Sequence, residues 1–139
     1  MSEGNKAIYR RMSEEIWKQG NLDRAGEFYT PDVVIHSARP GTPPGIAGVT
    51  ATVSMLRSAF PDLEISNQSI MAEGDLLTAR WIARGTHRGE LMGAPPTGKR
   101  VEFGGISIVR MSGGKIAEIW GESDQLGLMQ QVGLVPAMA

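Results

Sequence analysis

The sequence of 139 residues contains no cysteine. Disulfides, thiolate metal sites and cysteine nucleophiles are therefore excluded. The chain also lacks a block of charge of one sign: 14 lysine and arginine residues are balanced by 15 aspartate and glutamate residues, for a net charge of -1. Because nucleic acids and membrane surfaces bind concentrated basic patches, we expect neither as a partner.

Long hydrophobic runs are missing as well. No run is long enough to span a bilayer, and the polar start at residues 1–6 lacks the apolar centre of a signal peptide. We therefore expect a cytoplasmic protein. A chain of this length is typical of one domain, here residues 1–139, with room for a proper hydrophobic core.

Catalytic signatures of several common classes are absent too. There is no Gly-x-Ser-x-Gly turn and no phosphate-binding glycine loop, so nucleophilic hydrolases and nucleotide enzymes fit poorly. The spacing of the two histidines, His36 and His87, and the carboxylates matches no metal motif, so we expect no metal site.

The first part of the chain has helical periodicity. Ile8, Met12 and Ile16 recur every four positions, and Gly20 is a suitable stop. The pattern predicts helices over residues 5–19, 21–28 and 48–60, with a short strand at 33–36. Residues 38–45 contain three prolines and two glycines and read as a loop, of the kind that often covers a site.

The second part alternates like strands. Turn signals separate four segments, at residues 63–71, 76–87, 100–110 and 115–124. Gly104 and Gly105 fall inside the third segment, where they permit a bulge or a sharp bend. Helices first and strands later indicate an α+β fold, and we expect a cone in which N-terminal helices pack on a strongly curved, mainly antiparallel sheet.

The last predicted strand carries the best catalytic candidate. If its side chains alternate strictly, Trp120, Glu122 and Asp124 share a face with Ile116. On the inside of a curved sheet, this parity places Asp124 at the wall of an apolar pocket, where a carboxylate can act as a general base. The alternative is that Asp124 caps the helical segment that closes the chain.

His87 is the second candidate. It shares a strand face with Trp81 and with four small or apolar residues, whereas Arg80 and Arg84 fall on the opposite face. We therefore expect His87 to point inward, where it can donate a hydrogen bond to a developing enolate oxygen. The alternative is a histidine satisfied by a backbone carbonyl at the end of its strand.

Further residues are candidate substrate contacts, with an ordinary core or surface position as the alternative for each. Glu122 has the parity of Asp124, and His36 ends its strand just before the proline-rich loop. The complete set of predicted substrate contacts is His36, Trp81, Met92, Trp120 and Glu122.

Several segments, taken in order, resemble one known family. Residues 85–99 read GTHRGELMGAPPTGK, and AFPDL at 59–63, EGD at 73–75, GKI at 114–116, Trp120 with Asp124, and LGLMQQVG at 126–133 accompany them. Together they are similar to the SnoaL-like polyketide cyclases, of the nuclear-transport-factor-2-like superfamily of α+β cone folds. The similarity covers nearly the whole chain.

The resemblance implies an activity. Such cyclases close a polyketide ring by intramolecular aldol condensation without a metal or organic cofactor. It also implies that Asp124 is the acid/base and that His87 lies near it. The expected function is thus a cofactor-independent cyclase or isomerase acting on a hydrophobic polyketide-like carbonyl compound.

Two alternatives and one partner remain open. Epoxide hydrolysis, known in this superfamily from an Asp-Arg-Asp constellation, is disfavoured by the outward direction of Arg80 and Arg84. A non-catalytic domain for small-ligand binding or dimerisation comes from another functional class. The resemblance also implies a homodimer formed through the outer face of the sheet, where Ile82 lies among Thr78, Arg80 and Arg84.

Overall fold

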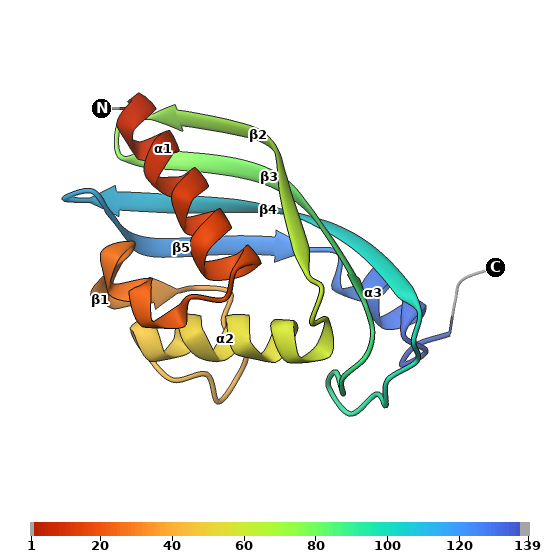
Figure 1. The fold of residues 1–139 in the computed structure, drawn as a ribbon. Coiled ribbons are helices and arrows are strands. Elements are labelled where there is room, and N and C mark those ends of the chain that lie inside the picture. The colour runs from red at the N-terminus through yellow and green to blue at the C-terminus, as the bar shows by residue number, and fades with distance from the viewer. Residues whose placement is uncertain (1, 137–139) are drawn as a thin grey trace.

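The computed structural model describes residues 2–136. Helical segments come first and long strands later, as the sequence predicts (Figure 1). The elements are α1 (Ser2–Met12), a π-helical segment (Ser13–Lys18), a 3-10 helix (Leu22–Glu27), β1 (Tyr29–Ile35), α2 (Ile46–Ala59), β2 (Glu64–Glu73), β3 (Leu76–Thr86), β4 (Arg100–Ser112), β5 (Lys115–Ser123) and α3 (Gln125–Gln131).

Strand β1 is the element that differs most from the expectation. It begins at Tyr29, four residues before the predicted start, and it contains Pro31. A proline cannot donate a ladder hydrogen bond, so it is tolerated only where one side of the strand is free. Strand β1 is an edge strand and therefore accommodates it.

The five strands form one curled, unclosed sheet in the order β1-β5-β4-β3-β2 (Figure 1). Strands β2 to β5 are an antiparallel meander, and β1 joins β5 in parallel. The helices cover one face, which we call the inner face; the other is the outer face. The α+β cone expected from the sequence is confirmed.

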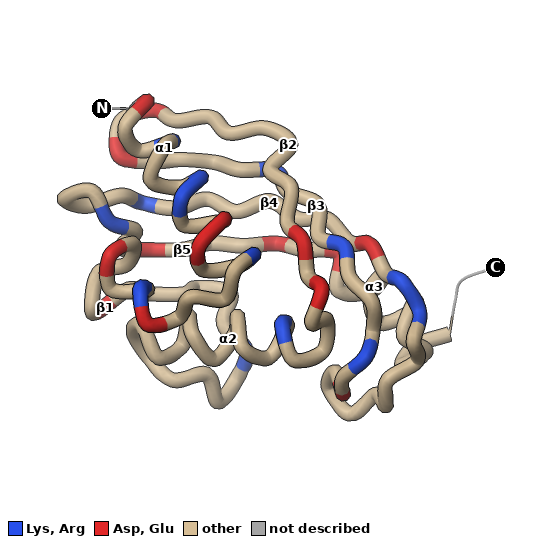
Figure 2. Tube along the Cα trace, viewed as in Figure 1, with Lys and Arg blue, Asp and Glu red and all other residues tan. Residues whose placement is uncertain are grey.

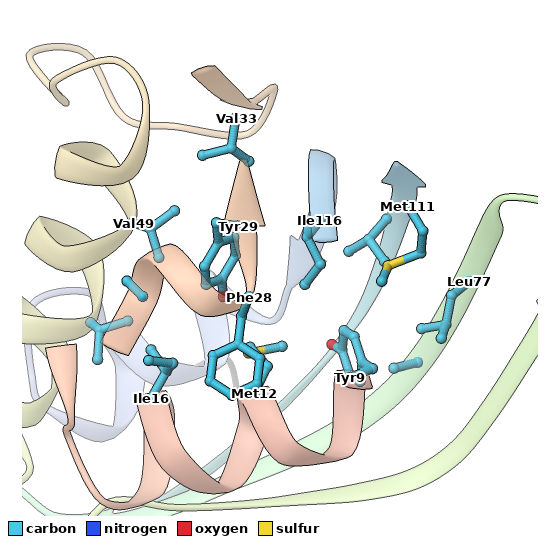
Figure 3. Close-up of a cluster of buried hydrophobic side chains, with 14 residues drawn as sticks. Tyr9, Met12, Ile16, Phe28, Tyr29, Val33, Val49, Leu77, Met111 and Ile116 are labelled. Carbon is cyan, nitrogen blue, oxygen red and sulfur yellow. The ribbon is translucent and has the colours of Figure 1, made fainter. Parts of the chain in front are cut away.

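The hydrophobic core lies between the inner face and the helices, and it has two parts. In the first, Tyr9, Met12 and Ile16 face the sheet residues Leu77 and Met111 (Figure 3). The second surrounds Phe60, Phe103, Leu91 and Leu128 at the other end of the sheet. The two clusters are separate, so the inner face between them is less completely covered.

Charged residues of both signs are interspersed along the chain (Figure 2). No helix among the described residues is long and apolar enough to cross a membrane. Within residues 2–136, no group of three or more histidine, aspartate or glutamate side chains is arranged to hold a metal ion.

Gly105 makes room for a neighbouring side chain and does not form a bulge. The register between β3 and β4 is continuous past Gly104 and Gly105, so of the bulge or bend that this pair permits, the bulge is not formed. A β-carbon on Gly105 would lie 2.3 Å from Cζ2 of Trp81. The position requires glycine because the indole of Trp81 lies across it.

A bulge does occur in β5, and it changes the direction of several side chains. Glu118 pairs with Arg110, but the next pair joins Ile116 to Met111, which leaves Ala117 as an extra residue. An extra residue reverses the alternation of the strand. Trp120 and Glu122 therefore share the outer face with Glu118, whereas Ile116 points inward. The expectation that all of them share one face was wrong.

Candidate functional site

Asp124 follows the last residue of β5 and begins α3. Its Oδ1 accepts a hydrogen bond of 2.8 Å from the Gly127 amide, and its own amide donates to the Gly104 carbonyl. The predicted cap is therefore present. The side chain is exposed, and Oδ2 accepts no hydrogen bond from the described residues, so one oxygen stays available for a ligand.

A hollow of about 340 Å³ lies beside Asp124. Its walls are mainly apolar side chains and glycine backbone, with one cation and one further carboxylate at the edge. The lining residues are Arg80, Trp81, Ile82, Gly104, Gly105, Ile106, Glu122, Ser123 and Asp124. Asp124 and Glu122 thus border the same hollow, but Trp120 does not line it.

His87 points inward, as predicted, and is completely buried. Its Nδ1 lies 3.0 Å from Oγ1 of Thr97 and 3.3 Å from the Thr97 amide. Because an amide can only donate, Nδ1 is an acceptor, and the neutral ring carries its proton on Nε2. Nε2 has no hydrogen-bond partner. The ring thus holds a buried, unused donor beside Phe60.

No hydrogen bond joins His87 to Asp124 among the described residues. The Asp124 amide donates to the carbonyl of Gly104, which pairs with Ile82, five residues before His87 on the same chain segment. Because the sheet is curled (Figure 1), this separation along the chain does not fix the distance between the two side chains, and their proximity stays a prediction.

His36 lies on the outer face with Trp120. The two rings are stacked, with centroids 4.7 Å apart. Glu118 accepts hydrogen bonds from Nε2 of His36 at 2.8 Å and from Arg110 at 2.6 Å. Together these bonds lower the pKa of Glu118, His36 contributing most. His36, Trp120 and Glu118 therefore lie on the opposite face of the sheet from the inward-pointing His87.

Met92 lies in the loop between β3 and β4, and Trp81 lies on the inner face near the middle of β3. Met92 has a positive φ of 48° in a tight turn closed by reciprocal hydrogen bonds between Leu91 and Ala94. This conformation costs roughly 1–2 kcal/mol for a residue with a β-carbon. Met92 is half-buried against the second core cluster, as is Trp81. Their contact with substrate stays a prediction.

Sequence reasoning missed one group of residues near the middle of the inner face. Ser107 pairs directly with Gly121, and Oγ of Ser107 accepts a hydrogen bond of 3.1 Å from the Trp81 indole. Oγ of Ser37 lies 3.3 Å from the place that a β-carbon of Gly121 would take. No sequence motif marks these residues, because a serine and a glycine that meet on paired strands are far apart along the chain.

The proline-rich loop does border a hollow, of about 460 Å³, between itself and β1. Arg39 ties this loop to two helices: its guanidinium lies 2.9 Å from Oε1 of Gln125 and 3.7 Å from Sδ of Met55. Gln125 in turn donates to Oγ of Ser123. The loop is therefore held against α2 and α3.

Asp62 anchors the end of β3 just before His87, and it gives a testable prediction. Its carboxylate accepts bonds of 2.7 Å from both the amide and the hydroxyl of Thr86, and the amide bond is the largest cause that lowers the pKa of Asp62. A carboxylate with a lowered pKa stabilises the fold at pH values above its ordinary pKa of 3.8, and this contribution disappears as the pH falls through the lowered value.

The Asp62→Asn variant should lose about 1 kcal/mol of unfolding free energy at pH 7 and less in acid. Denaturant unfolding at pH 7 and pH 3 measures this difference, with Asp32→Asn as control. An equal loss at both pH values contradicts it.

Comparison with known proteins agrees with this architecture. Residues 7–132 match the family model of the SnoaL-like polyketide cyclases. The chain is 31% identical over 133 residues to the aklanonic acid methyl ester cyclase DnrD of Streptomyces peucetius. This match covers 91% of this chain and 88% of that protein. It is 29% identical over 129 residues to the cyclase DauD of Streptomyces sp. strain C5, covering 91% and 80%.

Solved structures show the same fold. AclR of Streptomyces galilaeus, a candidate hydroxylase, has a TM-score of 0.87 at 29% identity. The match covers 100% of this chain and 87% of the AclR chain. IdmH of Streptomyces antibioticus, a candidate polyketide cyclase, has a TM-score of 0.80 at 34% identity, with coverage of 93% and 98%. The family match spans most of the chain and the named relatives are cyclases, so this protein belongs to the SnoaL-like polyketide cyclase family of enzymes.

Proposed function

We propose that this enzyme closes a ring in a hydrophobic, polyketide-like carbonyl compound by intramolecular aldol addition, without a cofactor. A base removes a proton from a carbon beside one carbonyl, and that carbon forms a bond to a second carbonyl carbon. The resulting alkoxide takes up a proton. Because no atom is lost, the first product is an isomer of the substrate.

The observation that carries this proposal is the position of the Asp124 carboxylate. One oxygen accepts from the Gly127 amide and the other has no partner among the described residues, and Asp124 lines the hollow together with Trp81 and Ile82. Apolar walls suit a hydrophobic substrate, and a fixed carboxylate suits proton abstraction. We assign the base role to Asp124 and the role of hydrogen-bond donor to the developing oxyanion to Nε2 of His87, which has no other partner.

The assay uses aklanonic acid methyl ester, the compound named for the two curated relatives. Conversion to a product of unchanged mass but different retention time is expected. In deuterated buffer, deuterium from the solvent should enter carbon positions only at the carbon beside the carbonyl from which the base removes a proton. Tight binding without any conversion of this or related diketo esters would instead favour the non-catalytic ligand-binding alternative.

We further propose a homodimer through the outer face. Ile108 lies directly opposite Trp120 and beside Thr78, and Ile106 lies beside Arg80. Ile106, Ile108 and Trp120 are 48%, 39% and 38% exposed, a contiguous apolar patch with polar residues around it. Ile106 also lines the hollow at Asp124, so a partner copy would border that hollow.

Ile108→Glu should convert the dimer to a monomer, because the partner would have to bury an unpaired charge. We expect the dissociation constant to rise by ~10²-fold or more, as measured by size exclusion with light scattering. Leu126→Glu, a similarly exposed position on α3, is the control and should leave the dimer intact. A parent protein that is monomeric at millimolar concentration rules the dimer out.

A further inference from the structure

The carboxylate of Asp124 lies directly against the backbone of Gly127. A β-carbon added to Gly127 would stand 2.7 Å from Cγ of Asp124, 2.9 Å from its Oδ1 and closer still to its Oδ2. Non-bonded atoms pack best at roughly 3.5–4.0 Å, so any larger residue at position 127 would displace the carboxylate. The three atoms nearest to that position all belong to Asp124. It is therefore the carboxylate that excludes a side chain at Gly127.

The backbone of α3 does not require a glycine at this position. Gly127 is the third residue of the helix, and its φ is not positive, so a residue with a β-carbon can adopt the same conformation. After proline, glycine is the least favourable residue in the interior of a helix. A helix built only for stability would carry alanine here. The glycine weakens α3, and what it permits is the present place of the Asp124 carboxylate.

Two hydrogen bonds hold Asp124 at this place. Its amide donates to the Gly104 carbonyl at 2.9 Å, which fixes the backbone, and its Oδ1 accepts from the Gly127 amide at 2.8 Å, which fixes the side chain. Within residues 2–136, Oδ2 has no hydrogen-bond partner. Because one oxygen is bonded and the carboxylate lies against Gly127, the direction of the second oxygen is set.

Gln131 ties Gly127 to the sheet. Its Nε2 donates to the Gly127 carbonyl at 3.1 Å and to the Glu102 carbonyl at 2.8 Å, and its Oε1 accepts from the Glu102 amide at 3.0 Å. Glu102 and Gly104 lie two residues apart on β4, so this strand holds both ends of α3. Asp124, Gly127 and Gln131 thus form one hydrogen-bonded unit with β4.

We propose that Gly127 positions the Asp124 carboxylate for proton abstraction, through its amide and through the absence of a β-carbon, and that Gln131 fixes Gly127 on β4. This inference rests on the proposed function, because it takes Asp124 as the base. Gly127 does not line the hollow beside Asp124, so it acts on a substrate only through that carboxylate. It is a positioning residue.

The Gly127→Ala variant tests this role, because it affects stability and turnover differently. Alanine favours the helix, whereas displacement of the carboxylate loses the cap, so the midpoint of denaturant unfolding should change little. With aklanonic acid methyl ester as substrate, kcat should fall by ~10²-fold, the loss typical of a catalytic group misplaced by about 1 Å. KM should stay near the parent value, because the walls of the hollow are unchanged.

Amide exchange measured by NMR tests the same arrangement without a substrate. The Gly127 amide is bonded to Oδ1 of Asp124, whereas the neighbouring Leu128 amide is bonded to the backbone carbonyl of Asp124. In Gly127→Ala, the amide of residue 127 should exchange ~10-fold faster after correction for intrinsic rates, and that of Leu128 should stay protected. Asp124→Ala, which has no carboxylate, gives the exchange rate of the unbonded amide.

Two further substitutions serve as matched controls and test the role of Gln131. Gly26→Ala adds a methyl group to another helical segment, where nothing lies within 4 Å, and should match the parent. Gln131→Leu removes the bonds that tie Gly127 to β4 and should lower kcat by ~10-fold with little change in KM, measured well below the unfolding midpoint. Gln130→Leu, at the preceding position of α3, should keep the parent kcat.

Parent-like kcat in Gly127→Ala, or a residue-127 amide that keeps its protection in that variant, overturns the positioning role of Gly127. Parent-like kcat in Gln131→Leu overturns the supporting role of Gln131. If the parent itself converts neither this ester nor related diketo esters, the proposed function fails. Amide exchange then still decides whether Gly127 holds the carboxylate.

Discussion

The Asp124→Asn variant is expected to fold and bind ligand like the parent, while its turnover falls by ~10²-fold or more. Asparagine has the size of aspartate, and its Oδ1 can still accept the Gly127 amide that begins α3, so the cap is preserved. The amide cannot act as a base. Steady-state kinetics together with denaturant unfolding separates the two effects, because only the rate should change strongly.

Further variants separate the base from the cap. Asp124→Ser also preserves a good N-cap but has no carboxylate, so it should be as inactive as the asparagine variant. Glu122→Gln removes the other carboxylate of the same hollow and should remain active if Asp124 is the base. A variant series in which Asp124→Asn turns over at the parent rate would falsify the assignment and leave Asp124 with its capping role alone.

Substitution of His87 is expected to have the second largest effect, and the structure allows its two nitrogens to be tested separately. Asparagine places an acceptor where Nδ1 binds Thr97 but offers nothing at Nε2. Glutamine places a donor near Nε2 but loses the acceptor for Thr97. If Nε2 donates to a developing oxyanion, His87→Asn should lose ~10²-fold in turnover and His87→Gln much less.

Stability should follow the opposite order. His87→Asn keeps the bond that fastens Thr97, whereas His87→Gln gives it up, and we expect the latter to unfold more easily by about 1 kcal/mol. Both are preferable to His87→Ala, which would leave a cavity in the second core cluster and cost roughly 2–4 kcal/mol. Activities that simply follow the stabilities would show that His87 is a structural residue.

The local pattern of the chain was sufficient to place most helices and strands. The four-residue spacing of Ile8, Met12 and Ile16 gave a helix, and turn residues bounded each long strand within a few positions of its observed end. The inward direction of His87 also followed from alternation, because β3 pairs with β4 without interruption. Where pairing is regular, parity counted along one strand is enough.

Only the tertiary structure decided which residues meet. The bulge at Ala117 depends on how β5 pairs with β4, and it moves Trp120 and Glu122 to the outer face although the sequence alternates without a break. Ser37 and Ser107 both lie within 4 Å of the β-carbon position that Gly121 lacks, because the turn after β1 and strand β4 lie on either side of β5. The free energy that selects such pairings comes from contacts between residues distant in sequence. A count along one segment therefore cannot reveal them.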